Sequence, residues 1–124
     1  MKVWVCLVLI VGAFSAPAHA ADTAYDSCMN KAVSTRDMQE CQKAALAAID
    51  VRLNAAYRKA MAALPADQQE KLRTSERLWI GFREADCQTF YGKETGTMAT
   101  IQGGACMMDR AEQRIHNLAE FTEN

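Results

Sequence analysis

The chain has 124 residues and nearly balanced charge, with 14 lysines and arginines against 15 aspartates and glutamates. This length fits one domain, and the charges alternate in sign without forming a block. A nucleic-acid partner would demand a basic stripe and an anionic membrane surface a basic cluster, so the composition argues against both.

The first twenty residues predict a secretory signal peptide, residues 1–20. Lys2 precedes an apolar run over residues 3–14, and small residues then lead to Ala18-His19-Ala20, the pattern that signal peptidase cuts after. A membrane anchor is the alternative, but a span needs roughly twenty apolar residues and this run is shorter. We therefore expect a mature domain of residues 21–124 that is periplasmic or secreted and has no membrane association after cleavage.

Removal of residues 1–20 takes away Cys6 and leaves four cysteines, Cys28, Cys41, Cys87 and Cys106. An even number of cysteines in a small exported chain predicts two disulfides. A zinc site or a dithiol redox centre would favour Cys-x-x-Cys, which the chain lacks, and His116 is the only histidine after the cleavage site. We expect no metal and no cofactor.

Scarce proline and glycine and abundant alanine after residue 20 predict helices with few breaks. In chain order, we expect helices over residues 23–32, 36–64, 66–91 and 98–121. Ser34 or Thr35 can cap the second helix, and Ser34 with Asp37 forms a loose capping box. Pro65 ends the second helix and suits the first turn of the third. Gly92 ends the third helix, and Gly103-Gly104 is a place where the fourth could bend or divide.

Residues at spacings of three and four give each long helix a stripe that should face the core. In the second helix the stripe is Met38, Cys41, Ala45, Ile49, Leu53, Ala56, Tyr57, Ala60 and Leu64. In the third it is Leu72, Ser75, Trp79, Phe82 and Phe90, with Leu78 and Cys87 alongside. In the fourth it is Ile101, Ala105, Met108, Ala111, Ile115, Leu118 and Phe121. Each stripe must be buried against another, which predicts an all-α fold: a small antiparallel helical bundle of three to four helices stapled by two disulfides.

Two disulfide pairings are compatible with this bundle. Cys28 and Cys41 lie symmetrically about the Ser34-Thr35 turn, and Cys87 and Cys106 about Gly96-Thr97, which favours the sequential pairs. Cys41 and Cys87 are centred on Leu64, so a 41–87 bond together with a 28–106 bond is also reachable.

No catalytic constellation stands out, and we expect no catalytic residues and no enzyme activity. His116 has Glu112 and Glu120 one helical turn away, which predicts a solvated, ion-pairing histidine. The acids that could supply paired carboxylates are Asp50, Glu76, Glu84 and Asp86, and we expect them to face solvent or to pair with arginine. We also expect Asp50 or Glu76 to pair with Arg83 or Arg114 between helices and to fix their register. A groove that combined Asp50, Glu76 and His116 would instead favour an enzyme.

The order of several residues carries a family resemblance. The pattern is Asp50-x-x-Leu53-Asn54-x-x-Tyr57, then Leu72, Glu76, Trp79, Arg83 and Cys87, and later Cys106, Arg114 and Leu118. Over about residues 28–121 it resembles the LprI-like lysozyme-inhibitor family of exported bacterial proteins. The family usually has Gln at the position of Glu76 and Thr at that of Ala111. The resemblance carries over no defined inhibitory site, and we interpret the matching residues Asp50, Leu53, Asn54, Tyr57, Trp79, Arg83 and Arg114 as structural.

The resemblance implies an exported, disulfide-stapled, protein-binding module that inhibits lysozyme or another cell-wall hydrolase. Lysozyme is basic, and its cleft holds two carboxylates that a rigid loop could cover. Lys93, Glu94 and Thr95 lie on a glycine-flanked loop near a cysteine, so we expect this loop to make the contact. The alternative is a periplasmic interaction or structural protein that binds another envelope protein or a toxin. The sequence carries no signal for an oligomeric state.

Overall fold

The computed structural model describes residues 19–93 and 96–123, and this part of the chain is helical apart from the short turns between helices and the last described residue. Four α-helices, α1 (His19–Lys31), α2 (Thr35–Ala63), α3 (Ala66–Lys93) and α4 (Thr97–Ala119), precede a 3-10 turn, η1 (Glu120–Thr122). The all-α prediction is confirmed, with helix ends within a few residues of those expected. Most of the predicted signal peptide lies outside the described residues, and the expected cut after Ala20 falls within α1. None of the described helices has the length and apolarity needed to cross a membrane.

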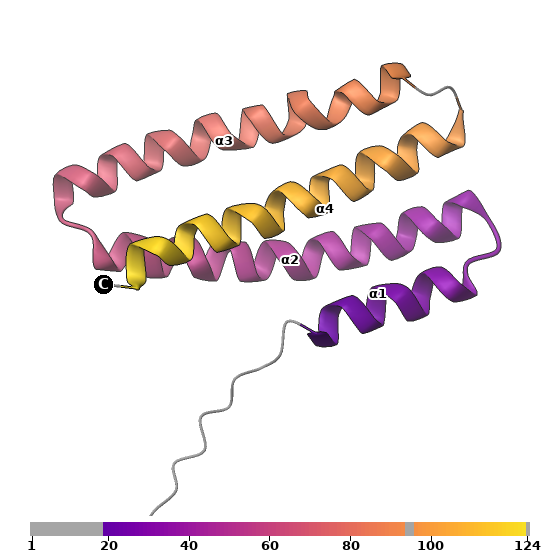
Figure 1. Cartoon of the computed structure of the whole chain (residues 1–124), viewed down its shortest axis with the longest axis horizontal. Helices are drawn as coiled ribbons and strands as arrows, with labels where there is room; N and C mark the ends of the chain where they lie inside the picture. Colours follow the sequence, from indigo (N-terminus) through magenta and orange to yellow (C-terminus); the bar gives the residue numbers. More distant parts are fainter. Residues whose placement is uncertain (1–18, 94–95, 124) are drawn as a thin grey trace, which may run out of the picture.

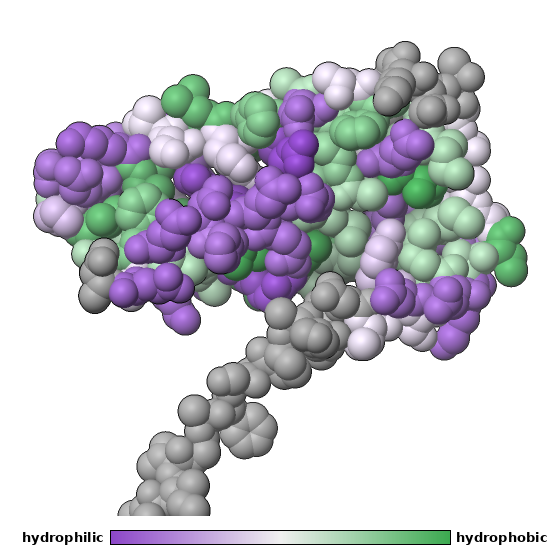
Figure 2. Space-filling model, viewed as in Figure 1, coloured by the Kyte–Doolittle hydropathy of each residue, from purple (hydrophilic) through white to green (hydrophobic). Residues whose placement is uncertain are grey.

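Consecutive helices run in opposite directions and form a bundle (Figure 1). The fourth helix packs along both α2 and α3, while α1 folds back onto α2. Few direct contacts join α2 to α3 beyond the turn between them. Figure 2 shows that hydrophilic residues gather over the middle and the left end of the face that α3 and α4 present, while apolar residues occupy much of its right half.

Short-range signals in the sequence account for the helix ends. Ser34 is the N-cap of α2: its hydroxyl accepts from the Asp37 N–H at 3.2 Å, and the Asp37 carboxylate accepts from the Ser34 N–H at 3.0 Å. The predicted capping box is therefore confirmed. Pro65 directly precedes α3, and its carbonyl accepts from the N–H groups of Gln68 and Gln69. Gly92 does not end α3, which continues to Lys93.

The Gly103-Gly104 pair does not divide α4, which is continuous. Gly104 instead lets a side chain of α2 come close, because a Cβ at this position would collide with the Gln42 amide. Gln42 is buried, and its Nε2 donates to the Ile101 carbonyl at 2.7 Å. This polar contact between α2 and α4 was not predicted from the sequence, because core positions were assigned from apolar residues.

The core contains apolar residues from all three long helices: Ile49, Leu53, Ala60, Leu72, Ala111 and Leu118. Tyr57 and Trp79 pack against it, as predicted. The prediction was wrong for Phe82, Leu78 and Phe121, which are 55%, 70% and 41% exposed, and for Ser75 and Ala105, which are also exposed. In α3 the reason is that Glu76 and Arg83, held in interhelical ion pairs, take inward positions and turn Leu78 and Phe82 toward solvent. Phe121 lies beyond the end of α4, in η1.

Both disulfides join consecutive helices. Cys28–Cys41 links α1 to α2 with a Cα–Cα distance of 5.7 Å, and Cys87–Cys106 links α3 to α4 with a distance of 5.5 Å. The sequential pairing is therefore confirmed, and the alternative with bonds 41–87 and 28–106 is wrong. The two bonds lie in the half of the bundle that is remote from the α2–α3 turn.

Candidate functional site

A groove of about 440 Å³ lies between α2 and α3, where the two helices diverge from their turn. None of its lining residues comes from α4. The lining residues are Asp50, Leu53, Asn54 and Tyr57 from α2, and Arg73, Glu76, Arg77, Trp79, Ile80 and Arg83 from α3. All motif residues that we interpreted as structural line this groove, except Arg114. The structure therefore gathers the motif at one surface.

The floor of the groove is fixed by a nearly buried ion pair between α3 and α4. Arg114 Nε donates to Glu76 Oε2 at 2.9 Å, and Arg114 Nη2 donates to Ser75 Oγ at 3.3 Å. The Arg114 and Glu76 side chains are only 11% and 15% exposed. Removal from water costs both charges hydration energy, and good hydrogen-bond geometry offsets much of that cost. This is one of the interhelical pairs expected from the sequence.

A second expected pair, between Arg83 and Asp50, crosses the groove with looser geometry. Arg83 Nη1 lies 3.6 Å from Asp50 Oδ1, and the Arg83 side chain is 12% exposed. Its Nε and Nη1 are buried without a hydrogen-bond partner among the described residues. The guanidinium instead lies over the Trp79 ring, with Cζ 4.9 Å from the ring centroid. Arg114 Cζ is 5.8 Å from the same centroid, so one indole orients both cations.

The remaining candidate acids and His116 do not complete a catalytic centre in the described part of the chain. Asp50 and Glu76 share the groove, but His116 is exposed on α4 and does not line it. Glu112 pairs with Arg52 of α2. Glu84 is exposed, as expected for a solvated acid.

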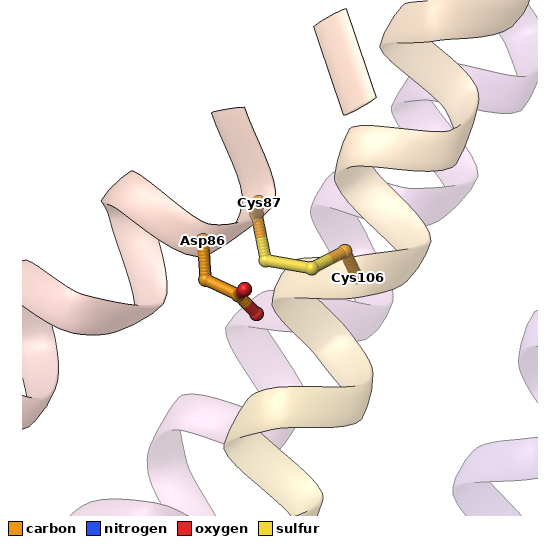
Figure 3. Close-up of side chains that lie close together, drawn as sticks. All are labelled: Asp86, Cys87 and Cys106. Atoms are coloured by element: carbon orange, nitrogen blue, oxygen red, sulfur yellow. A yellow bond between two sulfur atoms is a disulfide. The ribbon is translucent and has the colours of Figure 1, made fainter. Parts of the chain in front are cut away.

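Asp86 lies beside the Cys87–Cys106 disulfide (Figure 3), and one ligand atom from each of these three residues lies within 4.8 Å of the others. The two sulfurs are bonded to each other, so neither is the thiolate that a metal site requires. The Asp86 carboxylate accepts from Arg110 Nε at 2.8 Å, and this hydrogen bond raises the pKa of the guanidinium. The cluster is thus a structural tie between α3 and α4.

The predicted contact loop lies between α3 and α4. Lys93 is the last residue of α3, while Glu94 and Thr95 lie outside the described residues. Gly96 precedes α4 with φ 91°, a conformation that favours glycine. The Cys87–Cys106 bond ties the two helices that carry the loop.

Comparison with known proteins assigns the family. The model of the family described as lysozyme inhibitor LprI matches residues 28–118. The chain belongs to the LprI family. The matched range includes both disulfides and every residue that lines the groove. An uncharacterized protein of Rhizobium meliloti (strain 1021) is 28% identical, over 89% of this chain and 88% of its own length. No solved structure matches this LprI-family chain.

Proposed function

We propose that this protein is an exported inhibitor of lysozyme or another peptidoglycan hydrolase, and that it acts by binding the enzyme. The family match over residues 28–118 carries the proposal. The chemistry of the described residues supports binding over catalysis, because Glu76 and Asp86 each pair closely with an arginine of α4. Acids committed in this way are poorly suited to proton transfer with a substrate.

Export is supported by the sequence of residues 1–20 and by the two disulfides. Disulfides persist in oxidising compartments such as the periplasm and the exterior of the cell, where lysozyme also acts. The bonds give the inhibitor a stiff frame, since each joins two consecutive helices. A stiff partner loses little conformational entropy when it binds.

We place the contact at the tip of the α3–α4 hairpin, at Lys93, Glu94 and Thr95. A lysine suits a cleft that holds two carboxylates. The Cys87–Cys106 bond and the Asp86–Arg110 ion pair hold together the two helices that carry these residues.

The deciding experiment is a turbidity assay of lysozyme on bacterial cell walls with the exported, oxidised protein. We expect dose-dependent inhibition of at least one type of lysozyme, weakened by Lys93→Glu and unchanged by Lys43→Glu, which alters an exposed lysine of α2. Inhibition that Lys93→Glu leaves intact would move the contact away from the tip. No inhibition at large molar excess, against several lysozyme types, would contradict the function and favour another envelope protein or a toxin as partner.

A further inference from the structure

The α2–α3 groove has a charge pattern that its structural role does not explain. Arg83 and Arg114 are buried to nearly the same extent and share Trp79, but their hydrogen bonding differs. Arg114 donates to both Glu76 and Ser75. Within the described part of the chain, two buried nitrogens of Arg83 have no hydrogen-bond partner, and the oxygen of Asp50 lies beyond the usual distance of about 2.7–3.2 Å. Buried donors without acceptors are rare in native proteins and call for an acceptor.

The other charges of the groove leave it with one net positive charge. Glu76 is neutralised by Arg114 from outside the groove, and Arg73 pairs with Glu70 at 2.8 Å. Arg77 donates to the neutral hydroxyl of Thr74. Two cations, Arg77 and Arg83, therefore oppose the single carboxylate of Asp50. This balance suits a ligand with one negative charge, whereas a phosphate group carries about −1.5 to −2 and would be repelled by Asp50.

The size and the walls of the groove suit a compact organic molecule. Its volume of about 440 Å³ falls within the range of small-molecule sites, roughly 300–1,000 Å³. Leu53, Tyr57 and Ile80 provide apolar and aromatic surface, and Asn54 provides an amide that can donate or accept. An arginine fork matches both oxygens of a carboxylate. Arg83 Nε and Nη1 are buried without a hydrogen-bond partner among the described residues, so a ligand carboxylate would reach this fork by displacing the long contact with Asp50.

We propose that the groove between α2 and α3 binds a small monocarboxylic acid, with its carboxylate on Arg83 and Arg77 and an apolar or ring-bearing body against Tyr57 and Ile80. This site is separate from the hairpin tip and does not depend on inhibition of lysozyme. Asp50 competes with the ligand for Arg83, and Trp79 keeps the guanidinium in place.

The test is a titration of the exported, oxidised protein with N-acetylphenylalanine, followed by the NMR signal of the Trp79 indole N–H. The matched neutral probe is N-acetylphenylalaninamide, which differs only in the charged group. We expect saturable shifts with the acid and binding weaker by about ten-fold or more with the amide, the difference expected for a charge-assisted pair. Inorganic phosphate should bind more weakly than the acid. This comparison needs no variant and therefore does not depend on the folding of any mutant.

Variants then locate the site. Arg83→Gln should weaken binding of the acid by about ten-fold, Asp50→Asn should strengthen it, and Arg36→Gln, a change of an exposed arginine near the start of α2, should leave it unchanged. The proposal is overturned if the acid gives no saturable shift, if acid and amide bind equally, if phosphate binds more tightly, or if folded Arg83→Gln binds like the original protein. Lysozyme inhibition, measured on the same samples, reports on the other proposal separately.

Discussion

Glu76 of α3 and Arg114 of α4 form a nearly buried ion pair with better geometry than Arg83–Asp50, with Arg114 Nε 2.9 Å from Glu76 Oε2. The pair joins two helices at the floor of the groove, and its guanidinium lies against the Trp79 ring. Loss of one partner would leave the other charge buried and uncompensated, which is far more costly than loss of a solvated surface pair.

We therefore predict that Glu76→Ala lowers the free energy of unfolding by about 3 kcal/mol. Glu76→Gln should cost less, about 1–2 kcal/mol, because the amide oxygen still accepts from Arg114 although the charge of Arg114 is no longer compensated. Urea denaturation measures both values. Glu40→Ala, at an exposed position of α2, is the control and should change stability by less than about 0.5 kcal/mol. Equal losses for Ala and Gln at position 76 would show that the hydrogen bond is unimportant.

Short-range signals made much of the fold predictable from the sequence. The Ser34–Asp37 capping box and the turn at Pro65 each depend on residues a few positions apart. The disulfide pairing followed from the symmetry of cysteines about two hairpin turns, although a second pairing stayed open until the helices were placed.

Contacts between distant residues were harder to predict. The inward face of α3 was misjudged at Phe82 because apolar periodicity gives no weight to ion pairs such as Arg83–Asp50. Gln42 is buried because Gly104 of α4 leaves room for its side chain, and the sequence of α2 alone could not predict this contact. The interhelical pairs themselves were expected, but the groove that they line depends on how far α2 and α3 diverge.

Two glycines should respond to alanine in opposite directions. Gly104→Ala would force Gln42 away and break its hydrogen bond to Ile101 O, so we predict a loss of about 1–3 kcal/mol. Gly81→Ala is the matched control on α3, where a Cβ meets nothing within 4 Å. There the better helix propensity should stabilise the protein by about 0.5–1 kcal/mol. Thermal denaturation measures whether each substitution raises or lowers the stability. Stabilisation by Gly104→Ala would contradict the close approach of Gln42.

The two disulfides should stabilise different parts of the bundle, since Cys28–Cys41 joins α1 to α2 and Cys87–Cys106 joins α3 to α4. Replacement of Cys87 and Cys106 by alanine releases α3 from α4, and the entropy of a chain loop of this length predicts a loss of about 3 kcal/mol. If the hairpin tip is the contact, inhibition of lysozyme should weaken as well.

Replacement of Cys28 and Cys41 should mainly free α1, which packs on α2 alone. Hydrogen exchange of the α1 amides would then accelerate while those of α4 stay protected. Equal loss of protection in α1 and α4 would show that α1 is integral to the core.

Asp37 should give the stability a dependence on acid pH. Its pKa is lowered from the ordinary value of 3.8, chiefly by the hydrogen bonds with Ser34 and with the Val33 N–H. Because the folded pKa lies below the unfolded one, the ionised carboxylate stabilises the fold above pH 3.8, and this contribution is lost as the pH falls through the folded pKa.

We predict that Asp37→Asn lowers the free energy of unfolding near neutral pH. The difference in stability between the variant and the original protein should become smaller as the pH falls below 3.8, because Asp37 then loses its charge. Urea denaturation at a series of pH values between neutrality and strong acid measures this difference. Asp26→Asn, at an exposed position of α1, provides a control that removes the same charge outside the capping box. A difference for Asp37→Asn that stays constant across the series would contradict the prediction, because it would show that ionisation of the Asp37 carboxylate does not contribute to stability.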